Sequence, residues 1–445
     1  MFQYLLFVSF VIAAAYDPNW DSLDNRPLPS WFDESKIGIF LHWGLYAVPS
    51  FQGEWYWAYY NGKYQEIQKF HNKTYGPDFK YQDFANKFKA EMYDSDRWAD
   101  VFQKSGAKYV VLTSKHHEGF TMWPSKYSWN WNSGDVGPHK DLLGELATSV
   151  RNKGLKFGAY YSLYEWYHPI YLKDKSNKFN TTEFTDTHMI PQMKELVNTY
   201  KPEVFWVDGD WDAQDTYFDS LNFLAWLYND SPVKDTIVVN DRWGKGCPQH
   251  HGGYYSGPDR YEPGEIVHHK WEAAMTIQRK TWGYDRSQDY LGNGFLSEHD
   301  LLKTLVSTVA FGGNLLINVG PTDDGRIIPI IQERLIQMGE WLQVNGEAIY
   351  KTTPWRKQNQ TELVYYTQRK EDHVVYAHIT EWPENNQMDL QDPKATNNTT
   401  IQFIGYEQNL SFETMDSILR IYLPSLNIRQ MPCRQVFVLR MKYIE

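Results

Sequence analysis

The sequence predicts a (β/α)8-like barrel of the TIM type, followed by an antiparallel β-sandwich domain. Up to about residue 350, short apolar segments alternate with helical patterns, which is typical of parallel strands joined by crossover helices. No glycine-rich nucleotide-binding motif follows a strand, so an open nucleotide-binding sheet is not indicated. Beyond residue 350 the helical patterns stop. We therefore expect the barrel in residues 16–350 and the sandwich in residues 351–445.

The expected barrel strands are short apolar runs, as in strands that are buried on both faces. They are Lys36–His42, Lys108–Lys115, Leu155–Ser162, Val204–Val207, Thr236–Asn240 and Asn314–Gly320. Helical patterns separate them. Asp94 and Ser297 are expected to begin two of these helices, and Gly106 and Gly154 to end two.

Beyond residue 350, short β-like segments are separated by Asn, Asp, Pro and Gly. They are Leu363–Thr367, His373–Ile379, Thr400–Ile404, Ile418–Leu423 and Gln435–Met441. Their length and spacing indicate an antiparallel sandwich. Such a domain could bind carbohydrate, but packing against the barrel is the favoured interpretation.

The composition excludes some functions. The 445 residues carry a net charge of −11, and no basic run would follow a phosphate backbone, so nucleic acid is not an expected partner. The 19 tryptophans, 32 tyrosines and 23 phenylalanines are numerous, and aromatic rings stack on sugar faces as well as filling cores. No cofactor is expected.

The N-terminus resembles a leader peptide. Leu5 to Ala15 is apolar and ends in three alanines, which predicts a signal peptide at residues 1–15. The run is too short to span a membrane, so we expect no membrane insertion and a lysosomal or extracellular protein of the secretory pathway. Glycosylation sequons agree with this location. They begin at Asn72, Asn180, Asn359, Asn397, Asn398 and Asn409, with a poorer one at Asn229. Cys247 and Cys433 are expected to be unpaired.

Polar side chains follow the predicted strands. They are His42, His116, His117, Tyr161, Asp208 and Arg242. Because the strand ends of a barrel converge on one face, we expect these side chains to form one site. The histidines lack the spacing of familiar metal hydrolases, so no metal is predicted.

Glycoside hydrolysis needs two carboxyl groups beside the scissile bond. Asp208 ends a buried strand beside tryptophans and is the first candidate. The residues alone leave the second open among Glu54, Glu118, Asp210, Asp241, Asp259 and Glu272.

Several sequence motifs resemble those of the α-L-fucosidases of glycoside hydrolase family 29, particularly the animal lysosomal type. They are Gly38–Gly44, Lys115–Phe120, Tyr160–Ser162, Phe205–Asp210, Asn240–Trp243, His250–Tyr255, His269–Glu272 and Asn314–Gly325. The resemblance implies a retaining exo-hydrolase that removes terminal α-L-fucose from glycoproteins, glycolipids or oligosaccharides. It also implies that Asp208 forms a covalent fucosyl-enzyme.

The resemblance further implies the other site residues. The fucose-binding positions are His42, Glu54, Trp55, His116, His117, Tyr161, Trp206 and Arg242. Asp259 is the first choice for the acid/base, with Glu272 second and Glu54 third. The family's cysteine after Lys-Trp-Glu is replaced here by Ala274. The alternatives are an inactive fucose-binding protein on the same fold and a metal-dependent hydrolase. The sequence is compatible with a homo-oligomer, either a dimer or a tetramer.

Overall fold

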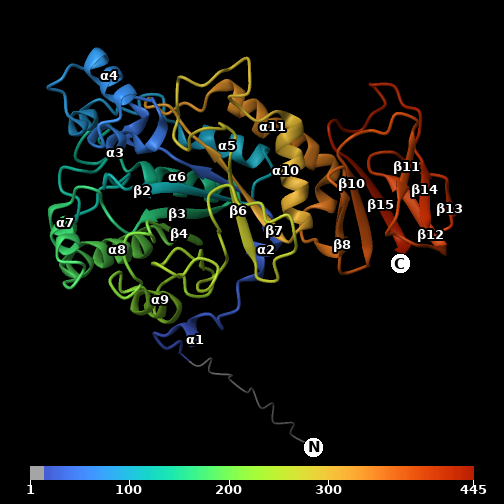
Figure 1. Cartoon of the computed structure of the whole chain (residues 1–445), viewed down its shortest axis with the longest axis horizontal. Helices are drawn as coiled ribbons and strands as arrows, with labels where there is room; N and C mark the ends of the chain where they lie inside the picture. Colours follow the sequence, from blue (N-terminus) through green and yellow to red (C-terminus); the bar gives the residue numbers. More distant parts are fainter. Residues whose placement is uncertain (1–14) are drawn as a thin grey trace, which may run out of the picture.

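The computed structural model describes residues 15–445, and its N-terminal part is built around a parallel sheet of seven strands. The spatial order is β5-β4-β3-β2-β1-β7-β6 (Figure 1). The strands are β1 (Ile37–Leu41), β2 (Tyr109–Lys115), β3 (Lys156–Ser162), β4 (Val204–Asp208), β5 (Val238–Val239), β6 (Trp271–Thr276) and β7 (Gly313–Val319). The predicted barrel-type fold is confirmed, with seven named strands in place of eight.

A short extended segment joins the two edges of this sheet. The amide of Tyr254 donates to the carbonyl of Val239, the last residue of β5, at 3.0 Å. The amide of Tyr255 donates to Lys270 O at 2.9 Å, and its carbonyl accepts from Glu272 N at 2.8 Å. Residues 254–255 therefore bridge β5 and β6 where an eighth strand would lie. The bridge lies within the loop that connects β5 to β6 and carries Asp259.

Helices cover the outside of the parallel sheet, and three of the longer ones begin at side-chain caps, of which Asp94 and Ser297 were predicted from the sequence. Asp94 accepts from Arg97 N, Asp141 from Gly144 N, and Ser297 from Asp300 N. The longer helices are α5 (Ser95–Lys104), α6 (Leu142–Asn152), α8 (Ile190–Tyr200), α9 (Ser220–Asn229), α10 (Glu298–Ala310) and α11 (Pro329–Asn345). The shorter ones are α1 (Trp20–Leu23), α2 (Ser30–Ser35), α3 (Tyr56–Asn61), α4 (Gln65–Thr74) and α7 (Pro169–Ser176).

Single helical turns and one π-helical segment complete the barrel part. The 3-10 turns are η1 (Leu45–Ala47), η2 (Gly53–Trp55), η3 (Tyr81–Asn86) and η5 (Gly346–Ala348), and the π-helical segment is η4 (Thr185–Met189). η1 and η2 lie in the connection from β1 to β2, and η2 contains two of the predicted site residues, Glu54 and Trp55.

The C-terminal part is antiparallel, as predicted. Its larger sheet has the order β12-β15-β10-β9-β8 and its smaller sheet the order β11-β14-β13. The strands are β8 (Thr353–Thr361), β9 (Val364–Arg369), β10 (Val374–Ile379), β11 (Gln387–Leu390), β12 (Ala395–Phe403), β13 (Phe412–Met415), β14 (Ile418–Tyr422) and β15 (Phe437–Ile444). In Figure 1 this orange-to-red part lies beside α10 and α11. The domain boundary at residue 350 stays a prediction.

Alternation along the strands gives the parallel sheet two apolar faces. Phe40, Tyr160 and Trp206 belong to one buried cluster, which fills the barrel interior. Their neighbours Tyr161 and Phe205 belong to the other, which packs under the helices. Because successive side chains of a strand point to opposite faces, this period of two decides which residues can reach the mouth of the barrel.

Three predictions concern the leader peptide, the cysteines and the membrane, and the structure bears on each to a different extent. Apart from Ala15, the predicted leader peptide lies outside the described residues. Cys247 and Cys433 are free, buried thiols, as expected. Among the described helices, none is long and apolar enough to cross a membrane.

Candidate active site

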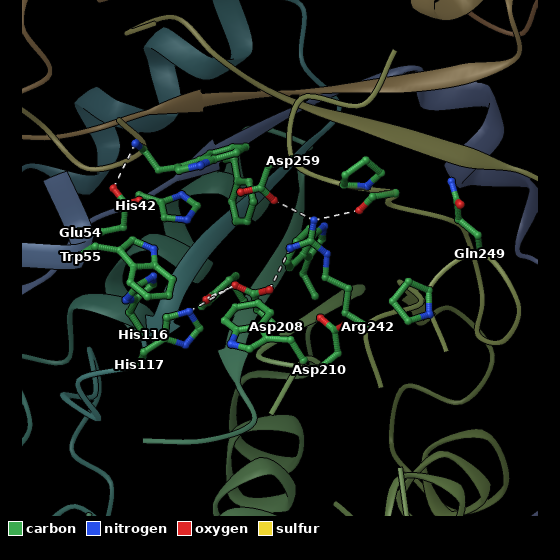
Figure 2. Close-up of a pocket in the computed structure, with 18 residues that line it drawn as sticks. His42, Glu54, Trp55, His116, His117, Asp208, Asp210, Arg242, Gln249 and Asp259 are labelled. Carbon is green, nitrogen blue, oxygen red and sulfur yellow. Dashed lines mark hydrogen bonds and ion pairs between the residues drawn. The ribbon is translucent and has the colours of Figure 1, made fainter. Parts of the chain in front are cut away.

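A cavity of about 670 Å³ opens at the carboxyl ends of the parallel strands (Figure 2). It contains most of the predicted site residues and several aromatic rings. The lining residues are Phe40, His42, Glu54, Trp55, His116, His117, Tyr160, Trp206, Asp208, Asp210, Trp211, Arg242, Pro248, Gln249, Gly257, Pro258, Asp259 and Trp282. The expected convergence of strand-end residues on one site is therefore seen in the structure.

Asp208 is the last residue of β4, is buried, and lines the cavity. Its Oδ2 accepts a hydrogen bond from the Tyr160 hydroxyl at 2.8 Å, and its Oδ1 accepts one from Arg242 Nη1 at 2.9 Å. Charge-assisted hydrogen bonds of this kind favour the ionised carboxylate and fix its direction. Asp208 is thus held in a fixed orientation with little access to bulk water.

Arg242 connects Asp208 to Asp259. One terminal nitrogen of its guanidinium binds Asp208, and the other donates to Asp259 Oδ1 at 2.8 Å and to Gly257 O at 3.0 Å. The guanidinium also lies over the Trp206 ring, 4.8 Å from its centroid. Figure 2 shows this bridge between the two carboxylates. The Asp259 side chain is 51% exposed, and its Oδ2 has no hydrogen bond to any described residue.

Asp241 organises the loop that carries Asp259. This buried carboxylate accepts from Gln249 N at 2.8 Å, Ser256 N at 3.0 Å and Ser256 Oγ at 2.6 Å. Ser256 Oγ in turn accepts from Arg242 Nε at 3.2 Å. Asp241 therefore acts on the site through the loop and through Arg242, and it does not line the cavity.

His117 has a defined tautomer. The Ser162 hydroxyl donates its proton to Tyr164 O at 2.7 Å, so His117 Nδ1, 2.6 Å from Ser162 Oγ, must carry a hydrogen and donate it. Burial and the positive charges of nearby groups lower the pKa of His117 well below its usual value. The imidazole is therefore neutral, and Nε2 is an acceptor that lies 3.6 Å from Asp208 Oδ2.

His42 is arranged in the same way. Asn318 Nδ2 donates to Trp282 O at 2.7 Å, so its Oδ1 accepts from His42 Nδ1 at 2.7 Å. Burial and the neighbouring His116 lower the pKa of His42 well below its usual value. The cavity thus contains two neutral imidazoles whose Nε2 atoms can accept hydrogen bonds from hydroxyl groups.

Glu54 enters the cavity from η2. Its Oε2 accepts from the amides of Trp282 and Gly283 at 3.1 and 2.9 Å, and burial raises its pKa. The next residue, Trp55, packs against His117 with a ring separation of 5.5 Å. Phe40, Tyr160, Trp206 and Trp282 form the remaining aromatic wall. The site therefore combines apolar faces with a few fixed polar groups, as sugar-binding sites require.

The prediction that Tyr161 lies in the site is wrong. Its hydroxyl donates to Gln192 Oε1 at 2.8 Å on α8, and Lys115 Nζ lies 4.1 Å from its ring centroid, outside the cavity. Tyr160 is the residue that contacts Asp208. The alternation along β3 decides this, because Tyr160 pairs in register with Trp206, which lies in the barrel interior.

Glu272, the second choice for the acid/base, lies in the barrel interior and does not line the cavity. Its carboxylate accepts from Tyr109 Oη at 2.5 Å and from Trp206 Nε1 at 3.1 Å. Burial raises its pKa to about 7. Trp206 lines the cavity, so Glu272 supports the floor of the site instead of contacting its contents. Its predicted role as an acid/base does not fit this position.

The structure adds lining residues that the sequence reasoning did not assign to substrate. Tyr160 could have been found from the two-residue alternation of β3. Trp282 and Gln249 lie in irregular segments with no such pattern. Asp210, one of the acids that the sequence left open as the second carboxyl group, lines the cavity, and burial together with Asp208 raises its pKa to about 6.

One group of side chains within the described residues has the spacing of a metal site. Glu165, His168 and His188 have ligand atoms within 4.8 Å of one another. Glu165 Oε1 already accepts from Lys115 Nζ at 2.9 Å and lies 2.8 Å from His188 Nε2. An ammonium group on the same oxygen disfavours a cation there, and the group does not line the cavity.

Comparison with known proteins agrees with this site. A family model described as alpha-L-fucosidase matches residues 7–347, and one described as alpha-L-fucosidase C-terminal domain matches residues 356–442. The chain belongs to the α-L-fucosidase family of glycoside hydrolases. The resemblance predicted from the motifs is therefore confirmed.

Full-length relatives support the assignment to this family. An alpha-L-fucosidase of Branchiostoma floridae is 54% identical over 433 residues, which cover 96% of each chain. The human tissue alpha-L-fucosidase is 48% identical, covering 96% of this chain and 91% of the relative. The crystal structure of a Thermotoga maritima alpha-fucosidase in complex with fucose superimposes with a TM-score of 0.82 at 34% identity, covering 96% of this chain and 100% of that one.

Proposed function

We propose that this exo-acting α-L-fucosidase hydrolyses terminal α-L-fucosides with retention, through a covalent fucosyl-enzyme on Asp208. The observation that carries the proposal is the guanidinium of Arg242, which binds Asp208 and Asp259 together in one cavity. Retaining glycosidases hold their two carboxyl groups about 5 Å apart, closer than inverting enzymes do. A single guanidinium that binds both carboxylates is in keeping with that short separation.

In the first step, Asp208 is the nucleophile. Its carboxylate attacks the anomeric carbon of fucose, the bond to the glycosidic oxygen breaks, and a fucosyl ester forms. The hydrogen bonds from Tyr160 and Arg242 orient the carboxylate before the attack. When the ester forms, the carboxylate of Asp208 loses its negative charge, and these same donors stay in place with little reorganisation.

Asp259 is the proposed acid/base. It is half exposed and can exchange protons with solvent, and its Oδ2 is left for the glycosidic oxygen. It donates a proton to the departing oxygen in the first step. In the second step it takes a proton from the water that attacks the anomeric carbon, and Asp208 is released. Glu54 and Glu272 are the less favoured candidates, because backbone amides, or a tyrosine and an indole, already bind their carboxylates.

The fucose ring is proposed to bind among His42, Glu54, Trp55, His116, His117, Trp206 and Arg242. The Nε2 atoms of His42 and His117 and the carboxylate of Glu54 accept from sugar hydroxyls, whereas Arg242 donates. Trp55 and the aromatic floor are proposed to contact the apolar faces of the ring.

A route through the secretory pathway to a lysosome or the extracellular space is also proposed. The leader-like residues 1–15 and several sequons support it, since Asn72, Asn180, Asn397, Asn398 and Asn409 are exposed. Asn229 is engaged instead, because its amide group makes two 2.9 Å hydrogen bonds with the backbone of Tyr16. A homo-oligomer stays a prediction, which sedimentation of the purified protein measures.

Trapping of the intermediate tests the mechanism. A ring-fluorinated fucosyl fluoride that forms a slowly hydrolysed ester should add the mass of one fluorinated fucosyl group to the peptide that contains Asp208. The first product released from an α-L-fucoside should be the α-anomer in a time-resolved NMR spectrum. A label on another carboxylate, or initial release of the β-anomer, would contradict the proposal. Fucose binding without any turnover would favour the inactive binding protein instead.

A further inference from the structure

The cavity extends beyond the residues that surround Asp208. Its volume of about 670 Å³ falls within the range, roughly 300–1,000 Å³, that holds ligands larger than one deoxyhexose. The additional lining comes from Asp210 and Trp211 after β4 and from Pro248 and Gln249 of the loop before β6. In Figure 2, Gln249 lies on the side of Arg242 opposite to His42 and Glu54.

Trp211 is held at the rim with part of its ring open. It packs edge-on against His117 and Tyr164, with ring centroids 5.4 and 5.9 Å apart, and lies 6.3 Å from the Trp55 ring. It nevertheless stays 41% exposed. Of the tryptophans in the described chain, only Trp211 and Trp129 are exposed, and Trp129 does not line the cavity. A fixed and open indole beside a carbohydrate site can stack on a sugar ring.

Two polar side chains that line the same cavity as Trp211 lack partners within the described part of the chain. The carboxylate of Asp210 and the side-chain amide of Gln249 line the cavity but make no hydrogen bond or ion pair with any described residue. Their loops approach the cavity from different strands. Together they offer acceptors and donors to a hydroxylated ligand lying between them.

The position of the proposed acid, Asp259, indicates where the leaving group lies. The proposed acid, Asp259, follows Gly257 and Pro258, which line the cavity on the same loop as Pro248 and Gln249. The glycosidic oxygen has to lie within reach of Asp259. The sugar that carries this oxygen therefore lies next to that loop, away from the inner wall formed by His42 and Glu54.

We propose that Asp210, Trp211 and Gln249 form a subsite for the sugar to which fucose is attached, a pyranose whose apolar face stacks on Trp211. Asp210 accepts from hydroxyl groups of this sugar, and Gln249 binds at its far edge. The inference rests on the proposed function, and it names a binding site for the leaving group that the fucose pocket does not include.

The test compares two substrates whose leaving groups differ. Fucosylated lactose has a sugar leaving group that would occupy the subsite, whereas α-L-fucosyl fluoride releases a single atom. For Trp211→Ala, the ratio of kcat/KM for fucosylated lactose to that for the fluoride should fall about tenfold. Trp211→Phe, which keeps a flat ring, should lose less. Trp129→Ala, the matched change at the other exposed tryptophan, should leave the ratio unchanged.

The outcomes are distinct. Turnover of the fluoride by the unaltered enzyme checks the proposed function independently of the subsite. If Trp211→Ala slows both substrates equally, Trp211 acts on the fucose pocket and the subsite is overturned. If Trp211→Ala does not fold, Trp211→Phe and Asp210→Asn decide, because each should still lower the ratio. An unchanged ratio in both of those variants would overturn the inference.

Discussion

The mouth of the barrel and the C-terminal β-domain differ in how far their charged side chains are buried. At the mouth, Asp208 and Arg242 are buried and form one network of charge-assisted hydrogen bonds. In residues 351–445, pairs such as Arg420–Asp389 are partly exposed. His378 is the only buried side chain there among His, Asp, Glu, Lys and Arg.

This difference separates a site from a packing domain. Removing a charge from water costs several kcal/mol unless partners replace the lost hydration, so a cluster of buried charges persists where the chemistry requires it. The C-terminal domain avoids that cost and buries mainly apolar side chains and hydroxyls. This burial of apolar side chains agrees with the interpretation that the C-terminal domain packs against the barrel. The following experiments compare substitutions in the two regions.

The largest expected difference comes from one substitution made in both regions. Asp208→Asn removes the proposed nucleophile, so kcat on an aryl fucoside should fall on the order of 10⁴-fold or more. Asp416→Asn changes an exposed aspartate in the turn between β13 and β14 and should leave kcat unchanged. Thermal unfolding of both variants checks the fold. Substantial residual turnover by Asp208→Asn would rule out its role as the nucleophile.

The second comparison uses two carboxylates that each pair with an arginine. Asp259 and Asp389 have similar side-chain exposure, 51% and 42%. Asp259→Ala should lower kcat/KM about 10²- to 10⁴-fold on substrates with poor leaving groups, much less on activated ones, and azide should restore turnover. Asp389→Ala should leave kcat/KM unchanged on both kinds of substrate.

Glu272→Gln separates the mouth of the barrel from its interior. It should lower activity to a similar extent on good and poor leaving groups, because Glu272 acts through Trp206. Azide should give no rescue. Azide rescue of Glu272→Gln together with full activity of Asp259→Ala would exchange the two roles.

The neighbouring tyrosines of β3 provide a smaller and more specific test. Tyr160→Phe removes the hydrogen bond to Asp208, so kcat/KM should fall roughly 10- to 100-fold. Tyr161→Phe removes the bond to Gln192 and should cost about 1 kcal/mol of unfolding free energy with little kinetic effect. Equal kinetic losses in both variants would contradict the assignment of Tyr160 to the site.

The last prediction concerns His378 and involves stability alone. The Thr367 hydroxyl donates to Ala348 O, so His378 Nε2 must donate to Thr367 Oγ1, and His378 Nδ1 lacks a partner among the described residues. Burial lowers its pKa to about 3 from 6.5. The unfolded chain therefore takes up a proton as the pH falls below 6.5, and the folded chain does not. Stability is full above this pH and declines from about 6.5 down to about 3.

Chemical denaturation at several pH values measures this decline. Between pH 6.5 and 5, His378 should remove about 2 kcal/mol of stability, and His378→Asn should flatten this part of the profile. His373→Asn alters an exposed histidine in the preceding turn and should leave the profile unchanged. If stability falls equally steeply with pH in His378→Asn and His373→Asn, His378 is not the cause of the decline.

The sequence by itself determined the fold class and placed most of the residues that line the cavity at the ends of strands. Apolar runs separated by capped helices specify parallel strands, and polar residues at their ends must meet at one face. For this reason the positions of His42, His117, Asp208 and Arg242 along the chain are enough to group them in one site.

Only the tertiary structure decided the finer choices. Tyr160 and Tyr161 are chemically identical, and the register of β3 on β4 determines which one reaches Asp208. Glu272 and Asp259 are both acids near a strand end, but one lies in the barrel interior and the other on the loop above it. Asp210 and Gln249 come from separate loops, so their shared subsite depends on long-range packing that no local pattern encodes.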